Sequence, residues 1–372
     1  MSSASDRGSA LRVLHVNDSA FTTTVLLAEA RRRGLPWTYQ PIAVAEPGWQ
    51  GPVGRARRAA RGGRWAAELG RRALRADLLH VHGATVVNHT SWVRRPYVLH
   101  LHGTDIRTSQ YDPRYAGLVA RAIDGAAGVL YSTPDLRDHA RRRRDDASLF
   151  PVPIDVDLLP ARRPSGASTV LFTSRWEPVK GLAVQLGIAA ELRRRHGDGL
   201  VLTGIDWGTG APAARELGVT LLPRSTHDGF LRLVAAASVA VGQPTGMVAA
   251  SELEAIGIGV PVVAPLRPDW YESSAGPHGG PAEGPALPPV EGGLAIGGRH
   301  ELPGQDAAWA PGDEPSGVVR RLAAALANEV DAVLADPDAA SARADGRRWL
   351  TANHGAAAAV DRLQGIYARE VT

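Results

Sequence analysis

Two cations, Arg175 and Lys180, stand in residues 174–181, between an apolar run and a helical pattern. Lys180 is the only lysine in the sequence, and all the other basic residues are arginines. Cationic hydrogen bonds and a helix N-terminus both favour anions. The segment therefore indicates a diphosphate site, although a surface pair of cations at a turn fits the same spacing.

Glu252 and Glu254 lie in residues 246–264, where an acidic helical pattern runs into Gly259 and then an apolar strand. A carboxylate near a helix start can accept both hydroxyls of a ribose, and the first-turn amides can meet a phosphate. Acids at a helix start also stabilise the helix dipole in any protein, so both interpretations stay open.

Two His-x-His pairs, His80/His82 and His100/His102, end apolar runs, and a glycine follows each pair. Ligands of open α/β sheets bind at the carboxyl ends of the strands. Alternation along a strand would put both rings of a pair on one face, a geometry that could chelate a metal. Because the glycines are expected to end the strands, we predict a buried first histidine, a second histidine in a cleft, and no metal.

Short apolar runs alternate with helical patterns, which predicts parallel sheets covered on both faces. In the first half, strands are expected at residues 11–16, 77–81, 97–101 and 128–132, with a helix at 22–33. In the second half, strands are expected at 169–173, 199–203, 219–222, 239–241 and 260–264, with a helix at 180–195. Residues 318–334 and 338–371 show helical periodicity, and the Gly/Pro-rich segment 265–316 is expected to be partly ordered.

A Pro/Gly/Ser-rich linker at about residues 151–168 separates the two blocks. We predict domains at 1–160 and 161–345, with a C-terminal helix at 346–372 crossing back to the first. Asp155 and Asp157 imitate the D-x-D of metal-dependent sugar transfer, but they lie in this linker and are not assigned a role.

Composition excludes several classes of protein. The 372 residues are 44% apolar and 22% charged, which is typical of folded domains. Without cysteine there is no disulfide scaffold, thiolate metal site or cysteine nucleophile. A net charge of +4 does not imply a nucleic-acid partner. No apolar run approaches the ~20 residues of a membrane span, and no signal-peptide pattern begins the sequence, so a cytoplasmic location is expected.

Two nucleotide-binding motifs are missing. The expected first strand runs into Asn17-Asp18-Ser19 without the G-x-G-x-x-G that lets a backbone approach a pyrophosphate. No G-x-x-x-x-G-K-[ST] occurs either. A dinucleotide-dependent dehydrogenase and a P-loop NTPase are therefore not favoured.

An arginine-rich helical stretch at residues 55–75 includes Trp65 and is predicted to be interrupted at Gly62-Gly63. A basic amphipathic helix can lie on an anionic membrane. Alanine dominates the apolar positions of this stretch, so a solvated face is favoured over peripheral membrane contact.

Several pieces, in order over nearly the whole chain, resemble a GT-B glycosyltransferase of the retaining, nucleotide-sugar-dependent family 4. They are residues 77–83 (DLLHVHG), 102–105 (HGTD), 132–136 (STPDL), 151–155 (PVPID), 175–181, 254–264 (EAIGIGVPVVA) and 353–367. The resemblance implies an α/β fold of two Rossmann-like domains facing a central cleft, with a C-terminal helix returning to the first domain. It also implies a nucleotide-sugar donor, a second-domain donor site and no metal or other cofactor.

The resemblance implies roles at matching positions. Arg175 and Lys180 would hold the departing diphosphate, and His102 would sit beside the transferred sugar. The expected donor-binding residues are Gly204, Arg224, Gly246, Met247, Val248, Ala249, Glu252 and Glu254. The expected acceptor-side residues are Asn17, Ser19, His82 and Asp105.

Two positions depart from the family pattern. A glutamate that usually contacts the sugar is Gly246 here, with Glu252 nearby but offset, and the glycine-rich loop after the first strand is missing. The departures favour an unusual sugar or a small-molecule acceptor such as a secondary metabolite. A nucleotide-sugar 2-epimerase, a non-catalytic nucleotide-sugar binding protein and a membrane-surface transferase remain alternatives.

Overall fold

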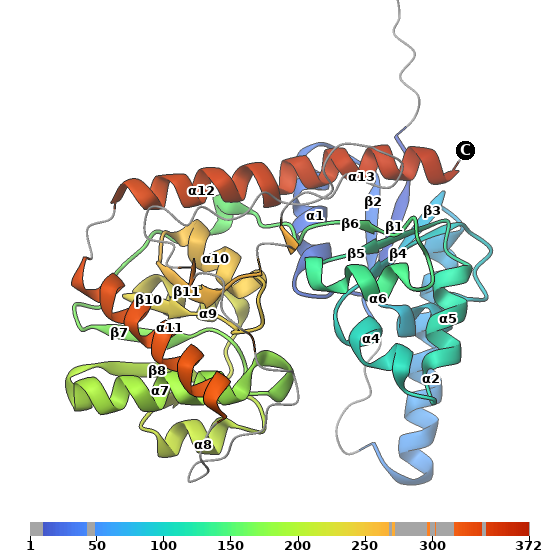
Figure 1. Cartoon of the computed structure of the whole chain (residues 1–372). Coiled ribbons are helices and arrows are strands. Elements are labelled where there is room, and N and C mark those ends of the chain that lie inside the picture. The colour runs from blue at the N-terminus through green and yellow to red at the C-terminus, as the bar shows by residue number, and fades with distance from the viewer. Residues whose placement is uncertain are drawn as a thin grey trace, which may run out of the picture. The chain divides into compact units, whose positions relative to one another are not determined.

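The computed structural model describes residues 10–42, 49–267, 270–271, 296–297, 302, 316–336 and 340–371. The chain divides into two compact units (Figure 1). Described residues of Met1–Pro153 and Ala356–Thr372 form the first unit, and those of Ile154–Ser273 and Pro285–Gly355 form the second. Each unit has its own parallel six-stranded sheet.

The sheet of the first unit has the order β2-β1-β3-β4-β5-β6. Its strands are β1 (Val13–Val16), β2 (Trp37–Gln40), β3 (Leu78–His82), β4 (Tyr97–Leu101), β5 (Gly128–Tyr131) and β6 (Ser148–Leu149). The sequence order reverses between β1 and β3, and ligands of open sheets bind at the carboxyl ends of strands at such a reversal.

Helices cover both faces of this sheet (Figure 1). They are α1 (Thr22–Arg32), α2 (Gly51–Ala73), η1 (Ala84–Val86), α3 (Val87–Thr90), α4 (Thr104–Arg107), η2 (Ser109–Tyr111), α5 (Ala116–Asp124), η3 (Pro134–Leu136), α6 (Arg137–Arg141) and α13 (Ala356–Val371). Alternate strand residues bury into two separate cores, so that Leu79 packs towards α5 while Leu78 packs towards α1 and α13.

The sheet of the second unit has the order β12-β11-β10-β7-β8-β9. Its strands are β7 (Thr169–Phe172), β8 (Val201–Ile205), β9 (Thr220–Leu222), β10 (Val239–Val241), β11 (Val262–Pro265) and β12 (Ile296–Gly297). Here the sequence order reverses between the neighbouring strands β7 and β10, so the ligand position predicted by topology is at their carboxyl ends.

The helices of the second unit include one element that corrects the sequence prediction. They are η4 (Val156–Leu158), η5 (Pro178–Lys180), α7 (Leu182–His196), η6 (Gly197–Gly199), α8 (Ala211–Glu216), α9 (His227–Ala236), α10 (Ala250–Ile258), α11 (Gly317–Ala335) and α12 (Ala340–His354). The helix expected from Lys180 begins only at Leu182, because Gly181 adopts a left-handed backbone (φ 70°) after the short turn η5.

The unit boundary falls after Pro153 rather than at 160. Ile154 pairs with Gly355, and the guanidinium of Arg347 donates to the carbonyl of Val156 at 2.8 Å, so these residues belong to the second unit. The helical periodicity at 318–334 and 338–371 corresponds to three helices, of which α11 and α12 belong to the second unit and α13 to the first. The prediction for 265–316 falls largely outside the described residues.

Candidate functional site

The carboxyl ends of β7 and β10 are joined by a charged hydrogen bond. Lys180, in the turn after β7, donates from Nζ to the side-chain oxygen of Gln243, just after β10, at 2.6 Å. Lys180 is half-buried and Gln243 is 1% exposed. The ammonium is therefore fixed at the position where the strand order reverses, which is where the topology predicts a ligand.

Three hydrogen-bond donors at these strand ends lack a partner within the described residues. They are the buried atoms Nε of Arg175, Nε2 of Gln243 and Oγ1 of Thr245. A buried donor without a partner costs about 1–3 kcal/mol, so such groups are uncommon unless a ligand or water satisfies them. Donors at strand ends that also hold an ammonium suit an anion.

A half-exposed indole, Trp207, lies beside two guanidinium groups after β8. The guanidinium carbon of Arg175 is 5.4 Å from the ring centroid, and that of Arg224 is 4.4 Å from it. Trp207 is 44% exposed. Cation–π contact holds both arginines against the ring, so the two predicted residues Arg175 and Arg224 meet at one aromatic side chain.

The Glu252 carboxylate is buried, and both of its oxygens accept hydrogen bonds. One carboxylate oxygen accepts from the Gln243 amide at 2.9 Å and the Thr173 hydroxyl at 3.2 Å. The other accepts from the Ala249 amide at 3.0 Å and the Ser251 hydroxyl at 3.1 Å. With 0% exposure and both oxygens engaged, Glu252 orders the ends of β7 and β10 and the start of α10.

Glu254 pairs with a histidine that the sequence reasoning missed. Nε2 of His227 lies 2.6 Å from a Glu254 oxygen. The Glu254 hydrogen bond raises the pKa of His227, against the opposing effect of burial. Glu254 side-chain exposure is 8% and that of His227 is 31%, so the carboxylate is largely buried and already paired.

The glycine at position 246 has a backbone reason. Gly246 has φ 89°, and a Cβ there would lie 2.7 Å from Leu302 Cδ1 and 2.8 Å from Arg267 Cγ. A glutamate would be strained as well as crowded. The backbone conformation of this loop therefore accounts for a glycine, and not a glutamate, at position 246.

The segment after Gly246 lies against the start of α10. Met247 and Val248 are buried, and the Val248 amide donates to the Tyr271 hydroxyl at 2.7 Å. The amide of Ala249 is bonded to Glu252. Ala250 and Ser251 are the next two residues of this first turn, where backbone amides have no partner inside the helix itself.

Gly204 makes room for an aromatic ring. A Cβ at this position would lie 2.9 Å from the indole of Trp176, which is fully buried. The missing side chain is thus explained by packing beneath the β8 end.

In the first unit, the loop after β1 adopts glycine-like backbone without glycine. Asn17, Ala20 and Phe21 have φ values of 71°, 50° and 59°. Asn17 donates from Nδ2 to the His82 carbonyl at 2.9 Å, and Ser19 accepts from the Thr22 amide. Non-glycine residues at positive φ are uncommon and cluster at functional sites. This loop therefore marks the β1–β3 reversal.

Asp105 ties together the loops after β3 and β4. Its carboxylate accepts from the His102 amide at 3.1 Å and from the Ala84 amide at 3.0 Å. Burial raises the pKa of Asp105. Asp105 is 7% exposed, so it positions the backbone of His102.

The expectation for the histidine pairs is corrected at His82. Alternation persists to His102, and five rings gather on the α1/α13 face of the sheet: His15, His80, His82, His100 and His102. His102 is half-buried, but His82, which was also expected in a cleft, is fully buried. His82 is the last residue of β3, and its ring still packs against those of His80 and His100.

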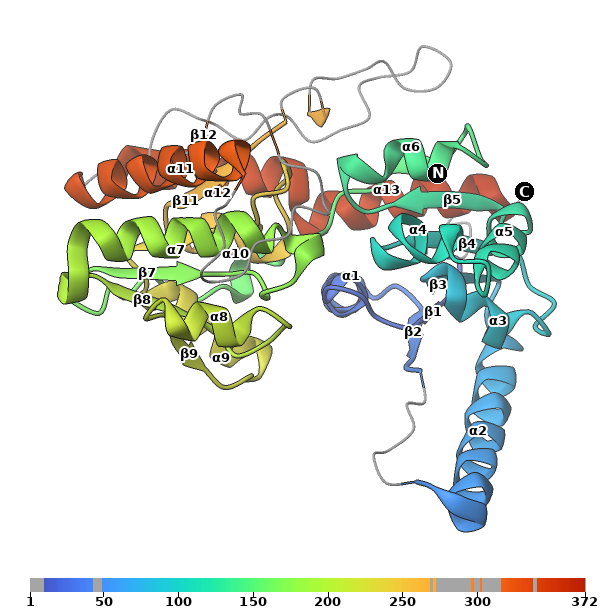
Figure 2. The same ribbon diagram turned by 60° about the horizontal axis from the view of Figure 1, so that its bottom comes forward.

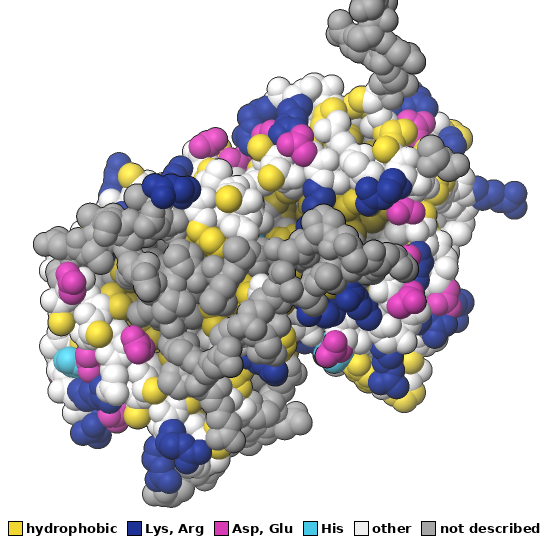
Figure 3. Space-filling view, turned by 45° about the horizontal axis from the view of Figure 1, so that its top comes forward, with side chains coloured by type: hydrophobic (Ala, Val, Ile, Leu, Met, Phe, Trp, Pro, Cys, Tyr) yellow, Lys and Arg dark blue, Asp and Glu magenta, His cyan; other side chains and the backbone are white. Residues whose placement is uncertain are grey.

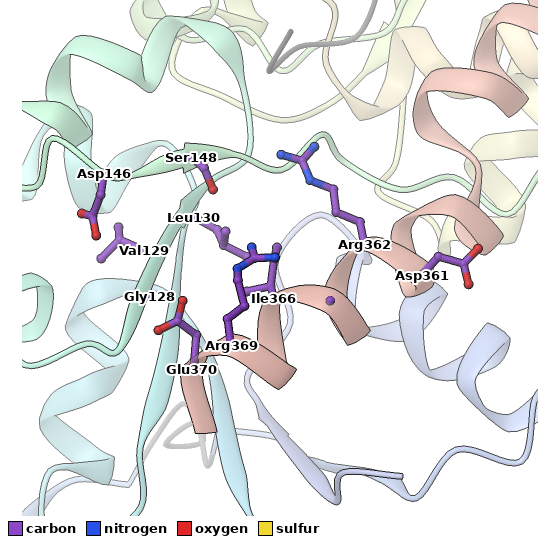
Figure 4. Close-up of a pocket in the computed structure, with 11 residues that line it drawn as sticks. Gly128, Val129, Leu130, Asp146, Ser148, Asp361, Arg362, Ile366, Arg369 and Glu370 are labelled. Atoms are coloured by element: carbon purple, nitrogen blue, oxygen red, sulfur yellow. The ribbon is translucent and has the colours of Figure 1, made fainter. Parts of the chain in front are cut away.

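One cavity of about 620 Å³ lies in the first unit between α13 and the strands β5 and β6 (Figure 4). Arg362 and Arg369 of α13 line it together with the acids Asp146, Asp361 and Glu370. The cavity reaches Gly128, where β5 begins, whereas His102 follows the end of the parallel strand β4. None of the predicted site residues lines it.

The basic helix α2 is continuous through Gly62 and Gly63, which corrects the predicted interruption. Figure 2 shows it running past the sheet of its unit. On the face seen in Figure 3, basic and acidic side chains are interspersed. Within the described residues, no helix combines the length and apolar character needed to cross a membrane.

Solved structures of similar fold cover nearly the whole chain. HepE from Anabaena in complex with UDP-glucose matches with a TM-score of 0.61 and 14% identity, over 97% of this chain and 100% of HepE. A UDP-forming α,α-trehalose-phosphate synthase from Burkholderia xenovorans matches with a TM-score of 0.55 and 12% identity, over 97% and 98% of the two chains. A putative UDP-N-acetylglucosamine 2-epimerase from Listeria monocytogenes matches with a TM-score of 0.54 and 15% identity, over 96% of each chain.

These similarities establish the α/β, GT-B fold that the sequence predicted. No protein-family model matches the sequence, and no curated protein matches it significantly.

Sequence reasoning missed Gln243, Thr245, Trp207 and His227. A signal existed for the first two, because Gln243 and Thr245 come within four residues of the end of the apolar run that forms β10. Trp207 and His227 carry no such local signal, since their relevance depends on Arg175 and Glu254 folding next to them.

Proposed function

We propose that this chain is a retaining glycosyltransferase that moves a sugar from a nucleoside diphosphate to a small-molecule acceptor without a metal at the diphosphate. The observation that carries the proposal is the set of buried donors of Arg175, Gln243 and Thr245 after β7 and β10 that have no partner in the described part of the chain, together with the Lys180 ammonium that Gln243 holds there. The complexes of HepE with UDP and UDP-glucose support a nucleotide-sugar donor.

The proposed chemistry follows from charge. Breaking the bond between the sugar and the diphosphate builds negative charge on the leaving oxygen, and fixed cations stabilise that charge more in the transition state than in the ground state. Lys180 is held by Gln243 and Arg175 by Trp207, so neither must reorganise as the charge develops. These two cations take the place of a divalent ion.

The sugar and base have proposed contacts in the same unit. Glu254 takes the ribose hydroxyls, the first-turn amides of α10 meet phosphate or sugar, and the base lies near Trp207 and Arg224. In the first unit, His102 and the Asn17–Ser19 loop are proposed to face the acceptor. Retention and membership of family 4 rest on the motif resemblance, and the departure at Gly246 supports an unusual sugar or a secondary-metabolite acceptor.

A panel of UDP-, GDP- and dTDP-sugars tests the proposal, with thermal shift and donor hydrolysis followed in the presence of EDTA. We expect one nucleotide series to stabilise the chain and to be hydrolysed slowly, with the anomeric configuration of the released sugar retained in its NMR spectrum. Absence of any nucleotide-dependent shift would contradict the donor site. Shift without turnover would identify a non-catalytic binding protein.

The similarity to the putative 2-epimerase favours one alternative. A hydrolysing epimerase would invert the configuration at the sugar C2 and use water in place of an acceptor, so that free nucleotide and the epimeric sugar are released. Analysis of the released sugar in the same panel separates this outcome from transfer or simple hydrolysis.

A further inference from the structure

Five imidazoles form an aligned array on one face of the first sheet. His15 comes from β1, His80 and His82 from β3, and His100 from β4, with His102 directly after it. The rings of His80 and His82 stack at 4.3 Å, and those of His100 and His102 lie 4.2 Å apart. Four of the five side chains are fully buried, and only His102 reaches solvent.

Two groups of three bring their ring nitrogens close together. One nitrogen each from His82, His100 and His102 lie within 4.8 Å of one another, and so do nitrogens of His15, His80 and His82. In the outer group, Nδ1 of His82 is 3.0 Å from Nε2 of His102. Two nitrogens bound to Zn²⁺ at ~2.0–2.1 Å in a tetrahedron are separated by about 3.3 Å. The His82–His102 pair is thus already near the spacing that one ion requires, and a nitrogen of His100 lies within 4.8 Å of the ligand nitrogens of both.

The hydrogen bonds behind the outer group fit its use as a ligand set. His82 has Nε2 3.3 Å from Nδ1 of His15, and His100 has Nδ1 3.3 Å from Nε2 of His80. His80 in turn contacts the Tyr367 hydroxyl through Nδ1. If His82 and His100 each donate through these atoms, Nδ1 of His82 and Nε2 of His100 remain as lone pairs, and His80 donates to Tyr367. Metal-binding histidines usually donate their second ring nitrogen in this way.

One buried nitrogen otherwise lacks a function. Nε2 of His100 has no hydrogen bond of normal geometry within the described residues, and a weaker backbone interaction with Phe150 also reaches this ring.

We propose that His82, His100 and His102 form a three-histidine site for a transition-metal ion, with Zn²⁺ the best match. Three neutral nitrogens suit the ion, which would keep its fourth position open to water or another ligand. The outer group is chosen over His15, His80 and His82 because His102 gives it a route from solvent. The ion would link β3 to the segment after β4. It has no part in holding the donor diphosphate.

The full chain, stripped with a chelator, is titrated with Zn²⁺ by calorimetry and with Co²⁺ by visible absorption. We expect one ion per chain, a tetrahedral Co²⁺ spectrum and a higher melting temperature with Zn²⁺. His102→Gln, at the partly exposed ligand, is expected to weaken binding by more than about tenfold while the chain stays folded. His89→Gln is the matched control, because His89 is exposed on α3 outside the array.

Three outcomes would overturn the proposal. The absence of binding to the folded chain would leave a hydrogen-bonded histidine array. Equal loss of binding in the His89→Gln control would indicate adventitious surface binding. Loss with His15→Gln but not with His102→Gln would move the ion to the inner group. No nucleotide sugar enters these measurements, so their result is independent of the proposed transfer reaction.

Discussion

Lys180 and Gln243 join the turns after two neighbouring parallel strands through a hydrogen bond of 2.6 Å from ammonium to amide oxygen. The strands are β7 and β10, between which the order of the second sheet reverses. The oxygen of the Gln243 side-chain amide thus holds the only lysine of the chain. The nitrogen of the same amide, Nε2, is buried and has no partner in the described structure. An anion there would complete the arrangement.

Lys180→Ala and Arg175→Ala are each expected to lower turnover of the donor by about 10²–10³-fold, because removing one fixed donor of transition-state charge costs ~3–4 kcal/mol. Single-turnover hydrolysis or transfer rates measure the effect. Arg194→Ala is the matched control, since Arg194 is an exposed cation in the last turn of α7. Turnover within about threefold of the parent in both site variants would contradict the diphosphate role.

Gly246→Glu restores the residue type that the resemblance places here, yet it is expected to destabilise the chain. Its φ of 89° and the nearby Leu302 and Arg267 side chains leave no relaxed position for a Cβ. We expect a loss of about 1–3 kcal/mol in the free energy of unfolding and no gain in turnover. Urea denaturation and donor kinetics measure the two effects.

Gly62→Ala is the control for the glycine experiment. Gly62 lies inside α2, and nothing is within 4 Å of a Cβ built there. This change is expected to stabilise the helix by about 0.5–1 kcal/mol. A stable, more active Gly246→Glu variant would show that the loop relaxes and that the lost glutamate alone limits activity.

The two glutamates of α10 are expected to respond differently to the same change. In Glu252→Gln the new side-chain NH₂ group faces the backbone N–H of Gln243 or Ala249, so that two donors oppose each other. This change should cost about 1–3 kcal/mol in the free energy of unfolding. Glu254→Gln instead removes a charged acceptor proposed for the ribose, and should cost about 1.5–3 kcal/mol of donor binding. Thermal unfolding and donor titration are measured on both variants. The reverse pattern, with Glu252 controlling affinity, would exchange their assignments.

The strands were the most predictable elements because they are continuous apolar runs. Residues 77–81 and 97–101 match β3 and β4 within a residue at each end. The strand β2, from Trp37 to Gln40, has no such run, and β6 has two residues only. These edge strands depend on pairing with β1 and β5, which a local pattern does not record.

The candidate site was predictable in residue type more than in role. Arg175, Lys180 and Glu254 stand out locally by charge and position. Glu252 looks equivalent to Glu254 in sequence, and only folding shows that its oxygens are already bonded. Likewise, each histidine pair is visible in sequence, but the array also requires His15 from β1, which the register places opposite His80.

Acid is expected to unfold the metal-free first unit sooner than an ordinary domain. Burial lowers the pKa of His15 to about 3 and holds those of His80, His82 and His100 well below the usual range. Below pH ~6.5 the unfolded chain takes up protons that the folded chain does not. The free energy of unfolding should then fall by about 1.4 kcal/mol per pH unit for each buried histidine.

His227 acts in the opposite direction, because Glu254 raises its pKa. Its contribution to stability is fully present below the unfolded-state pKa and is lost as the pH rises through the folded-state value. The five array histidines, including His102 with a pKa of about 3, all have lowered pKa values and lie in the first unit, whereas His227 lies in the second, so the histidine contribution to the stability of the first unit falls towards acid. Urea unfolding at several pH values between about 7.5 and 5 measures the slope of the free energy of unfolding against pH. His100→Gln should reduce this slope by the equivalent of one proton, and His89→Gln should leave it unchanged. A free energy of unfolding that stays level across this range would show that the folded array takes up protons as readily as the unfolded chain.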